Sequence, residues 1–519
     1  MNFKYYNWKN NPDLIIAIAA YLIIGFILIN NYQYIINSDG ISYISIAKHY
    51  LNGDFANAIN GYWSPLFSWL LIPFLLSSSD KVQLLFSTKV LALILGFFNI
   101  IGIYFLADKL NFDIKLKAGT LATSILLNLY FAFNFITPDL LVVCILIFYL
   151  NFLLDRRYSH SLSMGFLTGF TGALAFLSKS YMFFFFLVHF ILTNLYYGLK
   201  FPLRRRKIIK NLILGLTVFF IISGVWIGAI SDKYDKFTIG TAGYYNYAIA
   251  GPDSKGHPMY YAGLLKPPED CVYSVWEDPS YLPIQNWSPF ESKENFLYQL
   301  KIIWNNFIDF LNIIELFSIF SMLILFMAGF LAFKSSNNSI KDRFRILLLT
   351  ILIYSGGYCL IFLEIRYLWF VNVLLVLLGF LVVKTTSEEF SISKRFYNVL
   401  ILILCLSFII SPLIGLYQSS YSGSKVPIVA EDLKELGVKG NIASNNNWES
   451  SVYLAYYLDT KYYGQTNTSL SKDLGEELRR NDIKYYLIWG NSPLTNISGF
   501  EDMNYYQTDN LKVYYSKGV

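Results

Sequence analysis

The sequence predicts a polytopic α-helical membrane protein with a small α/β domain at its C-terminal end. Hydrophobic residues make up 55% of the 519 residues and charged residues only 15%, whereas soluble proteins carry about 25% charged residues. Long apolar runs recur through residues 1–418. Residues 419–519 instead alternate between short helical and short strand patterns.

We expect about eleven membrane-spanning helices, several of them shorter than the roughly twenty residues that a bilayer usually requires. They cover residues 14–36, 84–106, 117–136, 139–154, 163–178, 180–199, 209–230, 307–333, 344–363, 367–383 and 397–416. The first run is too long for the apolar core of a signal peptide and lacks a small-residue cleavage site. We therefore expect it to remain as a membrane anchor.

Basic residues in alternate loops orient these helices with the N-terminus in the cytoplasm. The inner loops hold the Lys and Arg residues of 109–117, 156–157, 204–207, 341–345 and 394–395. The apolar segment 63–76 is short and contains Pro65 and Pro73. Counting it as a span would move the 204–206 arginines outside, so we expect an interfacial or re-entrant helix. The amphipathic stretch 41–50 is expected to lie along the outer surface.

This topology predicts two domains in the cell membrane. Residues 1–418 form the transmembrane domain, with outer loops 37–82 and 232–305, and residues 419–519 form an extracytoplasmic domain. In that domain we expect helices over 429–436, 449–457 and 471–480 and strands over 441–444, 461–463 and 483–489. Such alternation favours a parallel sheet covered by helices. The domain has no GxGxxG or Walker motif, so nothing supports nucleotide binding.

Five ionisable residues interrupt the apolar segments, and the predicted topology places them all at the outer membrane face: Asp39, Asp139, Lys179, Glu364 and Arg366. A charge at the centre of a membrane helix costs roughly 2.5–3.5 kcal/mol, so such residues mark functional sites by default. Their convergence suggests a site for an anionic substrate embedded in the membrane.

Each of the five also has a structural interpretation. Asp39 is either a general base or the cap of a surface helix. Asp139 suits the positive end of a helix dipole, and Lys179 either pairs with a phosphate or extends its ammonium toward the interface. Glu364 and Arg366 either serve a phosphate clamp or form an ion pair where two helices separate.

Aromatic residues of the first outer loop are candidate sugar or acceptor contacts. Tyr43, Tyr62 and Trp63 can stack on sugar rings, although such residues also form ordinary interfacial belts. His257, in the second outer loop, is expected to be incidental, because the histidines do not group into a metal-ligand pattern.

In order and spacing, these residues resemble the GT-C superfamily of polytopic glycosyltransferases. The motifs that carry the resemblance are Asp39-Gly40, Pro138-Asp139, Leu177-Ser178-Lys179-Ser180 and Glu364-Ile365-Arg366-Tyr367. The chain looks most similar, over essentially its whole length, to the branch of protein O-mannosyltransferases and the lipid A aminoarabinose transferase.

The resemblance implies that a sugar moves from a polyprenyl phosphate to a hydroxyl acceptor, with inversion at the anomeric carbon. Asp39 would be the catalytic base, and Lys179 and Arg366 would hold the lipid phosphate. Asp139 and Glu364 would be supporting acids.

The chain departs from the family pattern at Gly40, where many members carry a second acid. Asp139 is our hypothesis for the missing carboxylate. The resemblance does not firmly imply any cofactor, and it leaves open the use of a divalent cation, Mg²⁺ or Mn²⁺.

The expected partners are a polyprenyl-phosphate-linked sugar, a glycan, lipid or protein acceptor, and the bilayer, with no nucleic acid. A lipid-linked glycan polymerase or ligase is an alternative, but the outer loop 232–305 lacks the arginines usual in that class. A flippase or transporter is another alternative, but the chain has no evident internal repeat. A non-catalytic scaffold would give no reason for five converging charges.

Overall fold

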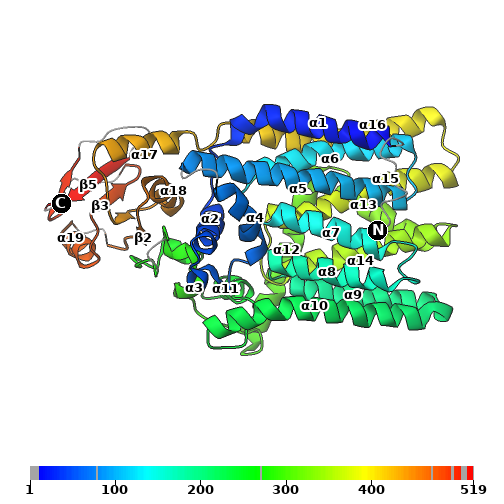
Figure 1. Ribbon diagram of the computed structural model, residues 1–519, viewed down its shortest axis with the longest axis horizontal. Helices are drawn as coiled ribbons and strands as arrows, with labels where there is room; N and C mark the ends of the chain where they lie inside the picture. The colour runs from blue at the N-terminus through cyan, green and yellow to red at the C-terminus, as the bar shows by residue number, and fades with distance from the viewer. Residues whose placement is uncertain are drawn as a thin grey trace.

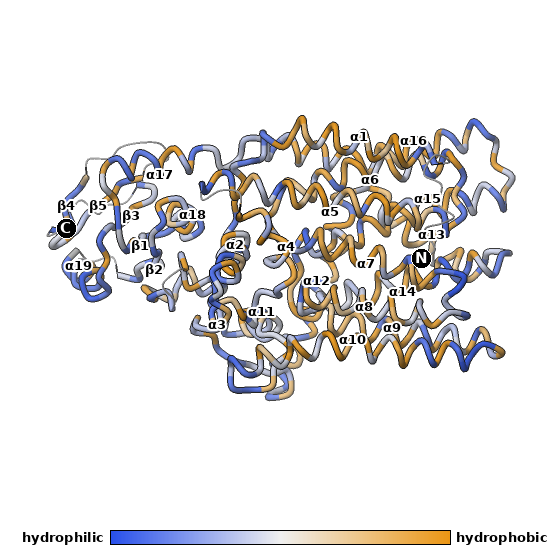
Figure 2. The backbone as a smooth tube through the Cα atoms, in the orientation of Figure 1, coloured by the Kyte–Doolittle hydropathy of each residue, from blue (hydrophilic) through white to orange (hydrophobic). Residues whose placement is uncertain are grey.

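The computed structural model describes residues 11–76, 80–268, 272–468, 471–491, 496–503 and 511–517. A long helical bundle occupies one side of the molecule, and a small α/β unit sits on one end of it (Figure 1). We call this end of the bundle the domain end and the opposite end the basic end. Hydrophobic residues dominate the bundle, and hydrophilic residues gather at the basic end and in the α/β unit (Figure 2).

Twelve helices form the bundle in the described part of the chain. They are α1 (Pro12–Leu28), α5 (Lys81–Lys109), α6 (Ile114–Asn134), α7 (Asp139–Leu153), α8 (Leu162–Ser178), α9 (Met182–Lys200), α10 (Arg205–Lys233), α12 (Lys293–Phe317), α13 (Ser321–Lys334), α14 (Asn338–Cys359), α15 (Trp369–Glu389) and α16 (Lys394–Ser419). Every segment that the sequence predicted to span the membrane is helical here.

Seven helices of the described chain are long and apolar enough to cross a membrane, or eight if α12 and α13 count as one span. The predicted span 307–333 is not one straight helix, because α12 and α13 are bent by 105°. At the bend, the Ser318 hydroxyl donates to Ser407 at 2.8 Å and accepts from the backbone N–H of Phe320 at 3.2 Å. These apolar helices and the fold confirm the predicted class, a multi-pass membrane protein.

Short elements cover the domain end: α2 (Ser38–Leu51), α3 (Phe55–Ala58), α4 (Pro65–Leu75), α11 (Ala242–Ile249), and the 3₁₀ turns η6 (Val275–Glu277) and η8 (Ile365–Leu368). The prediction that residues 41–50 lie along the surface is wrong, because most residues of α2 are buried. The loops and the α/β unit cover this helix (Figure 1).

The α/β unit contains α17 (Lys425–Glu435), β1 (Ile442–Ser444), α18 (Trp448–Leu458), β2 (Tyr462–Gln465), α19 (Ser471–Arg480), β3 (Tyr485–Ile488), β4 (Phe500–Asp502) and β5 (Lys512–Ser516). The strand order is β2-β1-β3-β5-β4. The first three strands are parallel, as predicted, whereas β5 and β4 extend the sheet in antiparallel fashion, which was not predicted.

Side chains alternate between the two faces of this sheet, as the strand period requires. Tyr485 and Leu487 join the main hydrophobic core together with α17 and α18. Tyr486 and Ile488 join a second, smaller core with α19. The main core runs without interruption from the bundle into the α/β unit.

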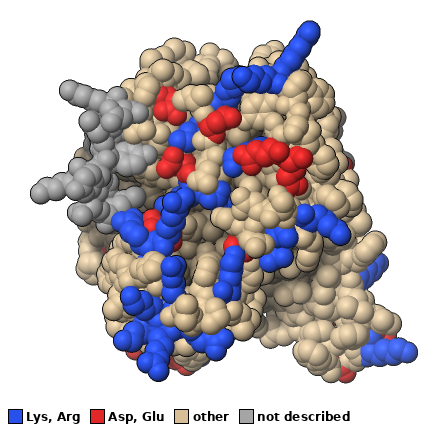
Figure 3. All heavy atoms as spheres, turned by 90° about the vertical axis from the view of Figure 1, so that its right-hand side faces the viewer, with Lys and Arg blue, Asp and Glu red and all other residues tan. Residues whose placement is uncertain are grey.

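Lys and Arg side chains gather at the basic end of the bundle (Figure 3). Several of them line a cavity of about 1080 Å³: Lys109, Arg156, Arg157, Arg204, Arg343 and Lys384. Their grouping at one end is what the positive-inside rule expects of a cytoplasmic face.

Helices α8 and α10 approach each other closely through small residues. A Cβ atom on Gly165 would lie 2.8 Å from the Cα of Asn211, and one on Gly169 would lie 2.8 Å from the Cα of Gly215. Such small-residue contacts are typical of helix packing in membranes. Because Lys179 is the C-cap residue of α8, this contact also fixes the position of a predicted site residue.

We expect Gly169→Ala to destabilise the protein, because the added methyl group would overlap with the backbone of Gly215. Overpacking of this kind costs about 1–3 kcal/mol. A Cβ on Gly224 of α10 meets nothing within 4 Å, so Gly224→Ala is the matched control. Thermal unfolding in lipid nanodiscs should show a lower Tm for Gly169→Ala only. Equal Tm values for the two variants would contradict the expectation.

Candidate active site

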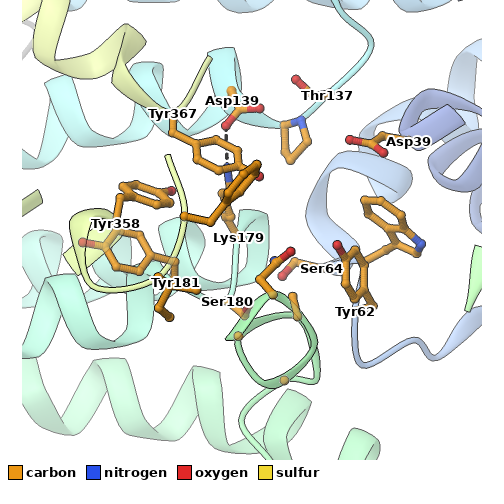
Figure 4. Close-up of a pocket in the computed structure, with 18 of the residues that line it drawn as sticks. Asp39, Tyr62, Ser64, Thr137, Asp139, Lys179, Ser180, Tyr181, Tyr358 and Tyr367 are labelled. Carbon is orange, nitrogen blue, oxygen red and sulfur yellow. Dashed lines mark hydrogen bonds and ion pairs between the residues drawn. The ribbon is translucent and has the colours of Figure 1, made fainter. Parts of the chain in front are cut away.

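A cavity of about 200 Å³ opens at the domain end of the bundle. Seven of the predicted site residues line it: Asp39, Tyr43, Tyr62, Trp63, Asp139, Lys179 and Arg366. The eighth, Glu364, bonds to Arg366 at 2.6 Å. Figure 4 shows Lys179 directed at Asp139, with Tyr358 and Tyr181 on one side and Asp39 and Tyr62 on the other. The fold thus brings together residues from the first loop, from the ends of α7 and α8, and from η8, just before α15.

Asp39 lies in the first turn of α2, but its carboxylate faces the cavity residues instead of capping the helix. The N-cap position belongs to Asn37. One Asp39 oxygen accepts from Arg366 Nη1 at 2.6 Å, and the other accepts from Trp276 Nε1 at 3.2 Å. The Asp39 side chain is 13% exposed. This geometry differs from the helix-cap interpretation and leaves the carboxylate at the cavity wall.

The two loops that carry the predicted acids are fastened to each other. Asn37 Oδ1 accepts from the backbone N–H of Ile136 at 2.9 Å. Gly40 packs against the same residue, since a Cβ on Gly40 would lie 2.6 Å from the Cβ of Ile136. An acidic side chain at position 40 has no room here. The close contact therefore explains why glycine occupies this position.

Asp139 and Lys179 form a buried ion pair. Lys179 Nζ lies 2.7 Å from Asp139 Oδ1, and the Asp139 side chain is only 5% exposed. The same ammonium lies 3.6 Å from the ring centroid of Tyr367, a cation–π contact. Lys179 therefore does not extend to the interface, because a carboxylate and an aromatic ring hold its ammonium at the cavity.

Arg366 forms ion pairs with the acids of the site. Its guanidinium bonds Asp39 and Glu364, each at 2.6 Å, and its Nε lies 4.0 Å from Asp139 Oδ2. The guanidinium fork suits several carboxylates at once. Glu364 is the most exposed of the three acids, at 35%. The predicted ion pair between Glu364 and Arg366 forms, and it is part of a larger network.

The predicted aromatic residues pack edge to face beside Asp39. Trp63 lies 5.2 Å from Tyr43 and 4.5 Å from Tyr62, measured between ring centroids. Trp63 and Tyr43 are 6% and 4% exposed, so little of either ring reaches the cavity. Sugar or acceptor contact by these three residues stays a prediction.

Two aromatic residues of loop 232–305, Trp276 and His257, lie beside this site. The sequence did not point to Trp276 and predicted no role for His257. Trp276 bonds Asp39, and its ring centroid lies 4.5 Å from that of His257. His257 had been expected to be incidental. The density of Tyr and Trp in the loop was the available signal, but only the folded chain brings these rings to Asp39.

The carboxylates of the site face cations of the protein. Asp39, Asp139 and Glu364 are each paired with Lys179 or Arg366. In the described part of the chain, no group of three or more His, Cys, Asp or Glu residues is arranged to hold a metal ion.

Comparison with known proteins identifies the architecture. No protein-family model and no curated protein matches the chain. The apo crystal structure of ArnT from Cupriavidus metallidurans matches with a TM-score of 0.59 and 12% identity, covering 96% of this chain and 97% of that chain. The structure of ArnT bound to undecaprenyl phosphate matches with a TM-score of 0.55 and 12% identity, covering 97% and 98%.

The chain has the GT-C fold of ArnT. The resemblance noted in the sequence is therefore confirmed at the level of the fold. The likeness to ArnT spans both the bundle and the α/β unit, because it covers nearly the whole of each chain.

We expect His257→Gln to flatten the acid side of the pH–stability curve. Burial lowers the pKa of His257 to about 4, although Asp39 acts in the opposite direction. In the unfolded chain, His257 takes up a proton once the pH falls below its ordinary pKa of 6.5. The folding stability that depends on neutral His257 is therefore fully present above pH 6.5 and is lost as the pH falls toward 4. Between about pH 7 and pH 4.5, Tm should fall further for the wild type than for the variant; parallel curves would contradict this.

Proposed function

We propose that this protein is a membrane glycosyltransferase that moves a sugar from a polyprenyl phosphate to a hydroxyl acceptor at the outer face, with inversion. The observation that carries the proposal is the site itself. One lysine and one arginine are held by carboxylates beside a cavity at the domain end of a GT-C bundle. Fixed cations of this kind stabilise the charge that develops on a leaving phosphate.

Lys179 and Arg366 are the proposed phosphate clamp. Arg366 offers a planar fork for two phosphate oxygens, and Lys179 adds a point charge. The same cavity is lined by Phe184 and Phe362, whose side chains are 59% and 41% exposed. These exposed apolar rings supply a wall along which a prenyl chain could enter from the lipid. The fold shared with ArnT, which has been crystallised with undecaprenyl phosphate, supports this class of donor.

Asp39 is the proposed general base. The acceptor hydroxyl oxygen attacks the anomeric carbon as the bond from that carbon to the phosphate oxygen breaks. The proton of the acceptor hydroxyl passes to the Asp39 carboxylate, and the electrons of the broken bond leave with the polyprenyl phosphate. The added negative charge on the phosphate falls beside Lys179 and Arg366. Attack opposite the leaving group inverts the anomeric centre.

In the structure Asp39 is paired with Arg366, so donor binding must redistribute this pairing. Three carboxylates and two cations give the site a net charge of −1 before the anionic donor enters. Glu364 is the most exposed of the acids, so its side chain can turn away at the least cost. The donor phosphate then takes the place of Glu364 on Arg366 and weakens the hold on Asp39. Asp139 keeps Lys179 in place and supplies the carboxylate for which position 40 has no room.

We expect Asp39→Asn to lower turnover by roughly 10²–10⁴-fold, the usual contribution of a general base, with the protein still folded. The measurement is the release of free polyprenyl phosphate from a panel of polyprenyl-phosphate sugars, in nanodiscs with a cell-envelope extract as acceptor. Asp253→Asn, an exposed acid of the second outer loop, is the matched control. Normal turnover in Asp39→Asn would remove Asp39 as the base. No release by the folded wild type from any donor would favour a transporter or a glycan polymerase.

We expect Arg366→Lys to weaken donor binding more than it changes acceptor selectivity. Lysine keeps the charge but loses the fork, and a hydrogen bond to a charged group is worth about 1.5–3 kcal/mol, or roughly 10- to 100-fold in Kd. Titration with undecaprenyl phosphate in nanodiscs measures this loss, with Arg395→Lys at the basic end as the control. Unchanged affinity would mean that the phosphate binds elsewhere.

A further inference from the structure

We infer that the α/β unit is part of the catalytic machinery. Trp448 of α18 acts as a positioning residue that holds the Asp39 carboxylate through His257 and Trp276. The inference rests on the proposed function of Asp39 and extends it, because it assigns a role to the C-terminal part of the chain.

Three rings in mutual contact, called here the ring stack, join Trp448 to Asp39, although only the Trp448–His257 pair is parallel. The ring of Trp448 lies parallel to that of His257, with an interplanar angle of 10° and a centroid distance of 5.1 Å. Trp276 contacts both rings, at 4.5 Å from His257 and 6.1 Å from Trp448. Its Nε1 donates to Asp39 at 3.2 Å. The position of the donor that bonds Asp39 therefore depends on a ring from the α/β unit.

The stack is largely buried, so it has little freedom to rearrange. Trp448 is 3% exposed and Trp276 is 6% exposed. The N–H of Met259 donates to His257 Nδ1 at 3.3 Å, which fixes the imidazole between the two indoles. Buried rings in mutual contact transmit a displacement because protein interiors are close-packed.

Helix α18 makes a second approach to the same point. Helices α18 and α2 are in direct contact. Partial desolvation and then the charge of Asp39 raise the pKa of Glu449 in the first turn of α18. Burial, and then the charges of Glu449 and Asp39, raise the pKa of Tyr453 on the same helix. Two further residues of α18 thus lie near Asp39, independently of the ring stack.

Both ends of α18 are fastened. At its C-terminal end, Asp459 accepts from Lys81 at 2.5 Å and from the Tyr273 hydroxyl at 3.1 Å. At its N-terminal end, the Gln465 side-chain oxygen, in the amide orientation that satisfies both groups, accepts from Asn447 and Trp448 N–H at 2.9 and 3.0 Å. A helix held in this way is a rigid support for a catalytic group.

The ring stack matters chemically because it decides how the Asp39 carboxylate is oriented. Trp276 bonds one oxygen and Arg366 the other. If the indole moves, the carboxylate can rotate about its side-chain bonds, and its alignment with the acceptor hydroxyl is lost. A misplacement of about 1 Å can cost on the order of 100-fold in rate.

The test compares Trp448→Ala with Trp448→Phe and with Phe500→Ala. Phe500 belongs to the second core, on the other face of the sheet, so its truncation removes a buried aromatic ring without touching the stack. We expect Trp448→Ala to lower kcat for polyprenyl phosphate release by about 10- to 100-fold. Its Kd for undecaprenyl phosphate should stay unchanged, because Lys179 and Arg366 are untouched. Trp448→Phe should recover most of kcat, and folded Phe500→Ala should keep it.

An unchanged kcat in Trp448→Ala, or an equal loss in Phe500→Ala, would overturn the inference. A second measurement does not depend on turnover. NMR detects the indole N–H resonance of Trp276, which is assigned by its absence in the spectrum of Trp276→Phe. The chemical shift of this resonance should change in Trp448→Ala and stay the same in Phe500→Ala. If the wild type releases no phosphate, the proposed function fails by itself, and an unmoved Trp276 resonance would then overturn the positioning role as well.

Discussion

The Arg366 guanidinium is the interaction on which the site depends. It lies between the carboxylates of three residues from separate segments: Asp39 after the first helix, Asp139 at the start of α7, and Glu364, two residues before Arg366 in the chain. A buried charge without a partner is costly, but Arg366 keeps two carboxylates nearby when one of the three is neutralised. The network therefore both fixes the geometry of the cavity and joins distant parts of the chain.

The bundle supplies the rigidity that this network needs. The close contact between α8 and α10 sets the place where α8 ends, and Lys179 is the residue that ends it. Gly40 and Ile136 set the distance between the two acidic loops in the same manner. Since all the site charges lie at one end of the bundle, they avoid most of the cost that charges at the centre of a membrane would carry.

Loop 232–305 and the α/β unit close the site from the other side. The loop contributes Trp276 and His257, and the α/β unit supports them through Trp448. The main hydrophobic core passes without a break from the bundle into this unit. The C-terminal residues are thus packed as part of the structure that surrounds Asp39.

The sequence by itself determined the membrane class, the helical segments, most elements of the α/β unit and the end of the bundle at which five charges meet. Hydropathy and residue periodicity are local properties, so they can be read without the fold. Only the tertiary structure decided that Arg366 pairs with Asp39, that Asp139 pairs with Lys179, and that position 40 has no room for a side chain. It also decided the bend between α12 and α13 and the antiparallel strands β4 and β5. These features depend on contacts between residues far apart in the chain, for which no local pattern exists.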